Sequence, residues 1–148
     1  MVVDEIRNAV RLREAGQARE ARERLEALWP TVSRGGDPFA VCFLAHSLAD
    51  LQDDLREQLR WHLVALEAAD EITDERAAEQ RVPGGRLGLY SLRLNLAEDY
   101  VRLGDDGRAA AHYRAGRDFV PFLGEESYGS GIRDGFDAYA AAHPDHLS

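Results

Sequence analysis

The chain has 148 residues, of which 45% are apolar and 30% charged, as in a folded domain large enough to bury a core. Its net charge of −9 disfavours a nucleic-acid partner, because a protein that neutralises phosphates needs a basic patch. It lacks the run of roughly 18 apolar residues that a membrane span requires. The single cysteine and an N-terminus without a leader pattern lead us to expect a cytoplasmic protein.

Two helices are predicted at the start of the chain. The first covers about residues 3–15 and ends at Gly16, since glycine adopts the left-handed conformation of a helix C-terminus at little cost. The second covers about residues 18–29 and carries apolar side chains at helical spacing. Pro30 is expected to end it, because proline lacks the N–H group that a helix interior uses.

The next two helices begin at recognisable caps. Asp37 precedes a proline at the first helical position, which predicts a third, strongly apolar helix over about residues 38–51. Asp54 with Glu57 three residues later is a capping-box pattern, and the fourth helix runs from there to at least residue 72. Residues 74–80 are predicted to extend this helix by as much as two turns.

In the second half of the chain, the sequence predicts a glycine-rich linker, a pair of helices and a last helix. The segment RVPGG, residues 81–85, breaks the preceding helix, and the glycines that follow it read as a linker. A tight turn at Gly104 joins two amphipathic helices between Ser91 and Pro121. The last helix covers about residues 125–142, with Tyr128, Ile132, Phe136 and Tyr139 as its apolar stripe, and residues 143–146 are expected to fray.

An internal repeat emerges when the turns at Gly16, Asp53 and Gly104 are aligned. Small residues recur before and after the turns, and larger residues recur one turn further into the second helix. The equivalent positions are Ala9, His46 and Ala97; Ala21, Gln58 and Ala109; and Leu25, His62 and Tyr113.

This alternation of small and large residues in paired helices resembles the tetratricopeptide repeat, a helix–turn–helix unit of about 34 residues. The resemblance implies an all-α, right-handed superhelix of about three hairpins within a single domain, residues 1–148. The hairpins would span about residues 3–30, 38–72 and 87–120, with residues 125–142 as a C-terminal capping helix. His46 and Gln58 depart from the pattern in the second unit, where small residues are usual.

The resemblance also implies a concave groove lined by the first helix of each hairpin. The groove would have an apolar centre with a charged rim, which suits an amphipathic helix or an apolar peptide. The alternative is that the central side chains complete the core or are covered by the chain's own last helix. The groove candidates are Ile6, Val10, Arg13, Phe43, Ser47, Asp50, Leu94, Glu98, Val101 and Arg102.

A metal or catalytic centre is the competing interpretation for the third and fourth helices. Cys42, His46 and His62 offer three soft ligands, but a buried thiol and two packed imidazoles are the interpretation that the sequence favours. Paired aspartates stand where helix caps belong, and the chain has no HExxH, paired CxxC or phosphate-binding loop. We therefore expect no cofactor, no metal and no enzymatic activity.

These observations predict a non-enzymatic scaffold or adaptor that binds another protein or peptide, with no nucleic-acid or membrane partner. Two alternatives stay open. One is a self-associating module that forms a homodimer through exposed apolar surface. The other is a regulatory or sensor domain that binds a small ligand or a peptide signal between its hairpins.

Overall fold

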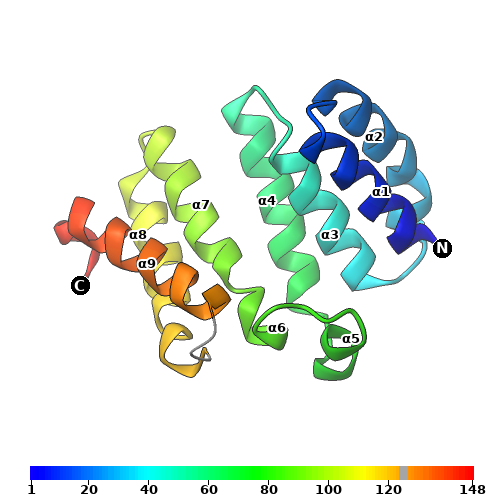
Figure 1. Cartoon of the computed structure of the whole chain (residues 1–148). Coiled ribbons are helices and arrows are strands. Elements are labelled where there is room, and N and C mark those ends of the chain that lie inside the picture. Colours follow the sequence, from blue (N-terminus) through cyan, green and yellow to red (C-terminus); the bar gives the residue numbers. More distant parts are fainter. Residues whose placement is uncertain (124–126) are drawn as a thin grey trace. The chain divides into compact units, whose positions relative to one another are not determined.

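The structure is a computed structural model that describes residues 1–123 and 127–148, with the side chains of Ser127 and Tyr128 left out. Its described residues form helices and connecting turns without a β-strand, which confirms the all-α class (Figure 1). No helix among them is long and apolar enough to cross a membrane. The chain divides into two compact units, Met1–Glu71 and Ile72–Ser148.

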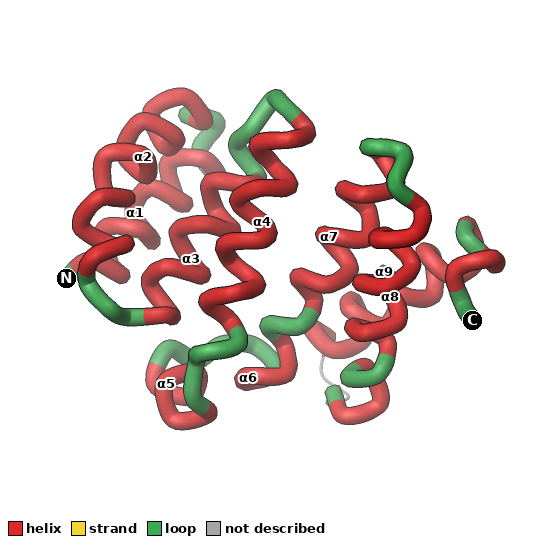
Figure 2. The backbone as a smooth tube through the Cα atoms, turned by 180° about the vertical axis from the view of Figure 1, so that it is seen from behind, coloured by secondary structure: helices red, strands yellow, loops and turns green. Residues whose placement is uncertain are grey.

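The first unit contains two helical hairpins. Helices α1 (Val2–Glu14) and α2 (Ala18–Arg34) form the first, and α3 (Pro38–Ala49) and α4 (Leu55–Ala69) form the second. Helix α3 packs on α1, α2 and α4, and it lies between α1 and α4 in both backbone views (Figures 1 and 2). This central place explains why α3 is the most apolar helix of the unit.

Large aliphatic side chains and alanines are buried together in the core of the first unit. Ile6, Leu25 and Leu44 are completely buried, and each such side chain contributes about 1.5–3 kcal/mol by leaving water. Ala9 on α1 and Ala21 on α2 are also completely buried. Both alanines were singled out by the repeat alignment.

Two of the three aligned turns have the same hydrogen-bonded geometry. After α1, Gly16 donates its N–H to the carbonyl of Arg13 at 3.0 Å, and Gln17 donates to the carbonyl of Leu12 at 2.9 Å. This is a Schellman motif, and it requires the left-handed φ of +85° that Gly16 adopts. The same pair of bonds follows α7, where Gly104 has φ of +81°.

The predicted N-caps of α3 and α4 are confirmed. The Asp37 side chain accepts a hydrogen bond from the Phe39 N–H at 3.1 Å, and Asp54 accepts from the Arg56 N–H at 2.9 Å. Each satisfies a backbone donor that has no partner within its own helix, an interaction worth about 1 kcal/mol.

The predicted end of α2 at Pro30 is wrong, because the helix continues through the proline to Arg34. Val32 in the last turn is 2% exposed, and Trp29 packs edge-to-face on Trp61 of α4 with ring centroids 5.0 Å apart. Burial of these side chains offsets the roughly 3 kcal/mol that an interior proline costs.

The predicted extent of α4 is also wrong. The helix ends at Ala69, and residues 74–79 form a separate helix, α5 (Asp74–Glu79). The hydroxyl of Thr73 accepts a hydrogen bond from the Arg76 N–H at 3.0 Å, so Thr73 starts a new helix instead of extending the old one. Within the predicted linker lies a single-turn helix, α6 (Gly85–Gly88).

The second unit is built on a third hairpin and a last helix that packs on it. Helices α7 (Ser91–Arg102) and α8 (Asp106–Arg117) form the hairpin. The 3₁₀ helix η1 (Val120–Phe122) follows, then α9 (Ser127–Ala142) and a second 3₁₀ helix, η2 (Pro144–His146). Helix α9 contacts α7, η1 and η2. The expected helical start at residues 125–126 and the side chain of Tyr128 lie outside the described residues.

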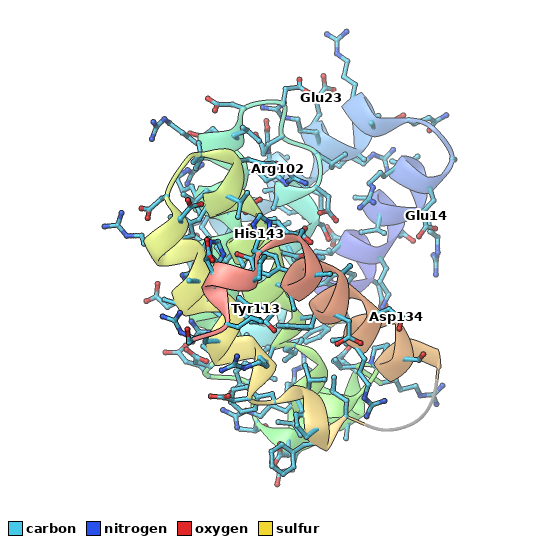
Figure 3. The ribbon with its side chains drawn as sticks, turned by 90° about the vertical axis from the view of Figure 1, so that its left-hand side faces the viewer. Glu14, Glu23, Arg102, Tyr113, Asp134 and His143 are labelled. Carbon is cyan, nitrogen blue, oxygen red and sulfur yellow. The ribbon has the colours of Figure 1, made fainter. Side chains whose placement is uncertain are left out.

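Aromatic side chains join α9 to the hairpin. Tyr113 of α8 stacks on Tyr139 of α9 with centroids 4.9 Å apart, and it lies beside the last helix in Figure 3. Ile132 and Phe136 are buried in the same cluster, as the apolar stripe predicted. A Cβ atom at Gly116 would lie 2.7 Å from the Phe136 ring, so α8 and α9 approach closely because this residue has no side chain.

The expected fraying after residue 142 is wrong. Residues 144–146 form η2, and His146 is 7% exposed. The Tyr139 hydroxyl and His146 Nδ1 are hydrogen-bonded at 2.8 Å, while the Arg114 guanidinium donates to the carbonyl of Ser148 at 3.1 Å. These contacts with α8 and α9 order the segment.

Gly116→Ala is expected to destabilise the protein by about 1–2 kcal/mol, because the added methyl group clashes with Phe136 and with the Cβ of Arg93. Gly131→Ala is the matched control, since a Cβ atom at Gly131 meets nothing within 4 Å. The control should stabilise α9 by roughly 0.5–1 kcal/mol through helix propensity. Urea unfolding measures both, and equal effects of the two substitutions would contradict the close packing at Gly116.

Ionisation of Tyr139 makes the free energy of unfolding depend on pH in the alkaline range. Burial, assisted by the carboxylates of Asp106 and Glu98, raises the pKa of Tyr139 to about 12. The unfolded phenol ionises near pH 10. The stabilisation is therefore complete below pH 10 and is lost as the pH rises toward 12. Tyr139→Phe should lose less unfolding free energy than the wild type between pH 9.5 and 11.5 in urea titrations, whereas parallel losses would contradict this account.

Candidate functional site

Four of the predicted groove residues lie on α1, on α3 or at the C-cap of α3 in the first unit. Val10 and Phe43 are half-buried. Arg13 and Asp50 are more exposed, and the Arg13 guanidinium donates to Asp50 Oδ2 at 3.0 Å. This ion pair connects the C-terminal ends of the two helices, and its two residues are 37 positions apart in the chain. The structure therefore brings together the predicted rim of the first two hairpins.

Two further candidates on these helices belong to the core. Ile6 is completely buried and Ser47 is 4% exposed, so neither side chain is available to a partner. Their side chains complete the packing between helices, as the alternative interpretation of the groove expects. The partly exposed apolar side chains that remain on this face are Val10 and Phe43.

In the second unit the chain's own last helix packs over the apolar candidates of α7. Leu94 and Val101 pack against the cluster that contains Ile132, Phe136 and Tyr139 of α9. A Cβ atom at Gly135 of α9 would lie 2.9 Å from Leu94 Cδ2. Of the polar candidates, Glu98 is half-buried, while Arg102 is exposed and lies 3.8 Å from Asp99.

A polar cluster lies where α3 faces α4. His46 lies in the last turn of α3, Asp50 is the C-cap residue four positions later, and His62 extends from α4. One ligand atom from each of the three residues lies within 4.8 Å of the others. The two imidazole rings have centroids 5.9 Å apart, and His46 Nδ1 is 4.0 Å from Asp50 Oδ2. Sequence reasoning named both histidines but missed the aspartate, although its i,i+4 spacing from His46 was a signal.

The environment of His46 favours its neutral imidazole form. Burial lowers the pKa of His46 below its usual value. Asp50 opposes this effect, whereas His62 and Arg13 reinforce it. A neutral imidazole nitrogen is the form that coordinates a metal ion or accepts a hydrogen bond.

Cys42 is not part of this cluster. The side chain is 4% exposed in α3, and burial raises the pKa of its thiol to about 12. A nucleophilic or metal-binding cysteine acts as the thiolate, which this environment disfavours. The structure therefore gives Cys42 the packing role that the sequence favoured.

The first unit also has a shallow pocket between the C-terminal ends of α2 and α4 and the start of α3. Ser33, Pro38, Val41, Val64, Glu67 and Glu71 are among the residues that line it. The acidic side chains give this pocket a preference for cations over anionic ligands.

Comparison of the chain with known proteins finds no matching family model, no matching curated protein and no matching solved structure. The fold and the residues above therefore define the class, an all-α protein of helical hairpins.

Cys42 is expected to react with a thiol reagent such as Ellman's reagent at least about 100-fold more slowly in the native state than in urea. Burial withholds both the sulfur atom and its thiolate form. The unfolded chain supplies the control, because its single cysteine should release one equivalent of chromophore. Complete labelling of the native protein within minutes would show that the thiol is accessible.

Proposed function

We propose that the protein is a non-enzymatic, cytoplasmic binding module of the tetratricopeptide type, in which the face formed by α1 and α3 accepts a segment of another protein. The repeat supports this assignment. Ala9 and Ala97 occupy equivalent positions in the first helices of their hairpins, and Ala21 and Ala109 do so in the second helices. All four alanines are completely buried, as close helix packing at repeated positions requires.

The observation that carries the proposal is that Phe43 is half-buried on the α1–α3 face and that the Arg13–Asp50 ion pair borders this face. Arg13 bonds to Asp50, 37 residues away in the chain, and Asp50 is the C-cap of α3, about two helical turns beyond Phe43. Phe43 and Val10 thus contribute apolar surface, and Arg13 and Asp50 contribute charge next to it. An apolar stripe bordered by charge is the surface that binds an amphipathic helix.

The second unit contains an intramolecular example of such binding. Helix α9 lies on α7, the first helix of its hairpin, and packs against Leu94. Helix α3 is the first helix of the preceding hairpin. An external helix bound to α3 would therefore pack as α9 packs on α7. In the proposed complex, the apolar side of the partner helix contacts Phe43.

The net charge of −9 indicates the chemistry of the partner. An acidic protein attracts basic segments and repels its own copies over a distance of about 8 Å at physiological salt. We therefore propose a helix with an apolar stripe and flanking lysine or arginine residues. The same charge disfavours a homodimer through this face.

Phe43→Glu should weaken binding of basic amphipathic helical peptides by about tenfold or more, because a carboxylate would replace the central apolar contact. The probes are synthetic helices with basic flanks and their acidic-flank counterparts, measured by fluorescence anisotropy. The variant should still unfold cooperatively, since Phe43 is outside the fully buried core.

Phe122→Glu is the matched control, because this phenylalanine lies in η1 of the second unit and is 72% exposed. It should leave peptide affinity unchanged. Equal loss from both substitutions, equal binding of basic and acidic peptides, or binding of none of them would refute the proposal. Light scattering over a concentration series should find a monomer, and a stable dimer that Phe43→Glu dissociates would identify a second copy as the occupant.

A further inference from the structure

We propose that His46, Asp50 and His62 form a binding site for a divalent transition-metal ion, with Zn²⁺ as the best-suited ion. Two imidazole nitrogens and one carboxylate oxygen are a ligand set that zinc accepts. The three ligand atoms lie within 4.8 Å of one another, and they come from two helices of one hairpin. This site shares Asp50 with the charged border of the proposed peptide surface, but it uses different chemistry.

The backbone places the three ligands with little freedom. His46 in the last turn of α3 and Asp50 at its C-cap are four residues apart, and Asp50 keeps a helical backbone conformation, so both side chains lie on the same edge of the helix. His62 belongs to α4, which packs along α3, and its ring is 2% exposed. The buried imidazole is therefore the fixed ligand of the site, and the two residues of α3 approach it.

Small side-chain movements suffice to close the site around an ion. Ligand atoms about 2.0–2.2 Å from a tetrahedral zinc ion are roughly 3.3–3.6 Å apart. Closure from 4.8 Å requires a shift that side-chain rotation supplies. The side chains of His46 and Asp50 are 40% and 32% exposed, so they have room to rotate.

Arg13 supports the ionised carboxylate. Its guanidinium bonds to Asp50 Oδ2 at 3.0 Å, and a carboxylate has a second oxygen and several lone pairs. Carboxylates that bind metals are commonly held by such an outer hydrogen bond. With three protein ligands, the ion would keep a coordination position for water.

The repeat gives an independent reason to assign a role to these histidines. The positions equivalent to His46 in the other hairpins are Ala9 and Ala97, which are completely buried at helix contacts. The middle hairpin has the His46 side chain there, which is 40% exposed and lies beside the buried imidazole of His62, with ring centroids 5.9 Å apart. Departures from a local packing rule are typical of functional sites.

Other histidines of the described residues are engaged elsewhere. His146 is hydrogen-bonded to Tyr139 at 2.8 Å, and its other ring nitrogen is 3.9 Å from Asp106. His112 Nδ1 is 3.1 Å from a guanidinium nitrogen of Arg93, so this ring nitrogen is already engaged. Of the described residues, His46, Asp50 and His62 form the group that meets the geometric requirement for a metal ion.

The test is titration of the full chain with Zn²⁺ by calorimetry and with Co²⁺ by visible absorption. We expect one ion per chain, a d–d spectrum typical of nitrogen and oxygen ligands, and a higher melting temperature at saturation. His46→Gln and Asp50→Asn should each weaken affinity at least about tenfold. Both residues are partly exposed, so these variants should fold, as circular dichroism will verify.

His143→Gln is the matched control, because His143 lies next to η2 in the second unit and outside the cluster. Its affinity should equal that of the wild type, and Mg²⁺, which prefers oxygen ligands, should not compete. The proposal is overturned if neither Zn²⁺ nor Co²⁺ binds one to one, or if His46→Gln and Asp50→Asn bind as the wild type does. Loss of binding in His143→Gln would place the ion elsewhere and would also overturn it.

Discussion

The close approach of paired helices is the constraint on which both units depend. Two helices can approach each other only where one of them has a small side chain, and this chain places alanine or glycine at such points. Ala9, Ala21, Ala97 and Ala109 are completely buried, and a Cβ atom at Gly116 would lie 2.7 Å from atoms of α7 and α9. Interiors packed to this density have little room for added volume, so these contacts define how each hairpin closes.

The hairpin of α3 and α4 follows this rule least, and it is also the part of the chain with the richest chemistry. His46 occupies the position of an alanine, and His62 that of Leu25 and Tyr113. A hairpin can tolerate imidazoles at such positions if they are hydrogen-bonded or coordinated. The apolar faces of α3 supply enough burial to compensate, since Leu44 and Leu48 are completely buried.

The candidate site was predictable in part, and its limits have physical causes. The family resemblance assigned Phe43, Asp50 and Arg13 to a predicted groove, and the structure brings Arg13 and Asp50 together. The sequence could not show that Ile6 is buried, because the difference between a core residue and a groove residue depends on how far the neighbouring helix extends. Nor could the sequence show that Asp50, and not Cys42, lies beside the two histidines, since Asp50 and Cys42 are each one turn from His46.

The sequence by itself determined the features that depend on a few neighbouring residues: the caps at Asp37 and Asp54, the glycine turns and the all-helical class. These features are local because a side-chain oxygen or a left-handed φ acts on backbone groups within about four residues. Tertiary structure alone decided that α2 continues through Pro30, that η2 is ordered and that α9 covers Leu94. Each of these outcomes depends on burial against residues distant in the chain, and burial of that kind outweighs local propensity.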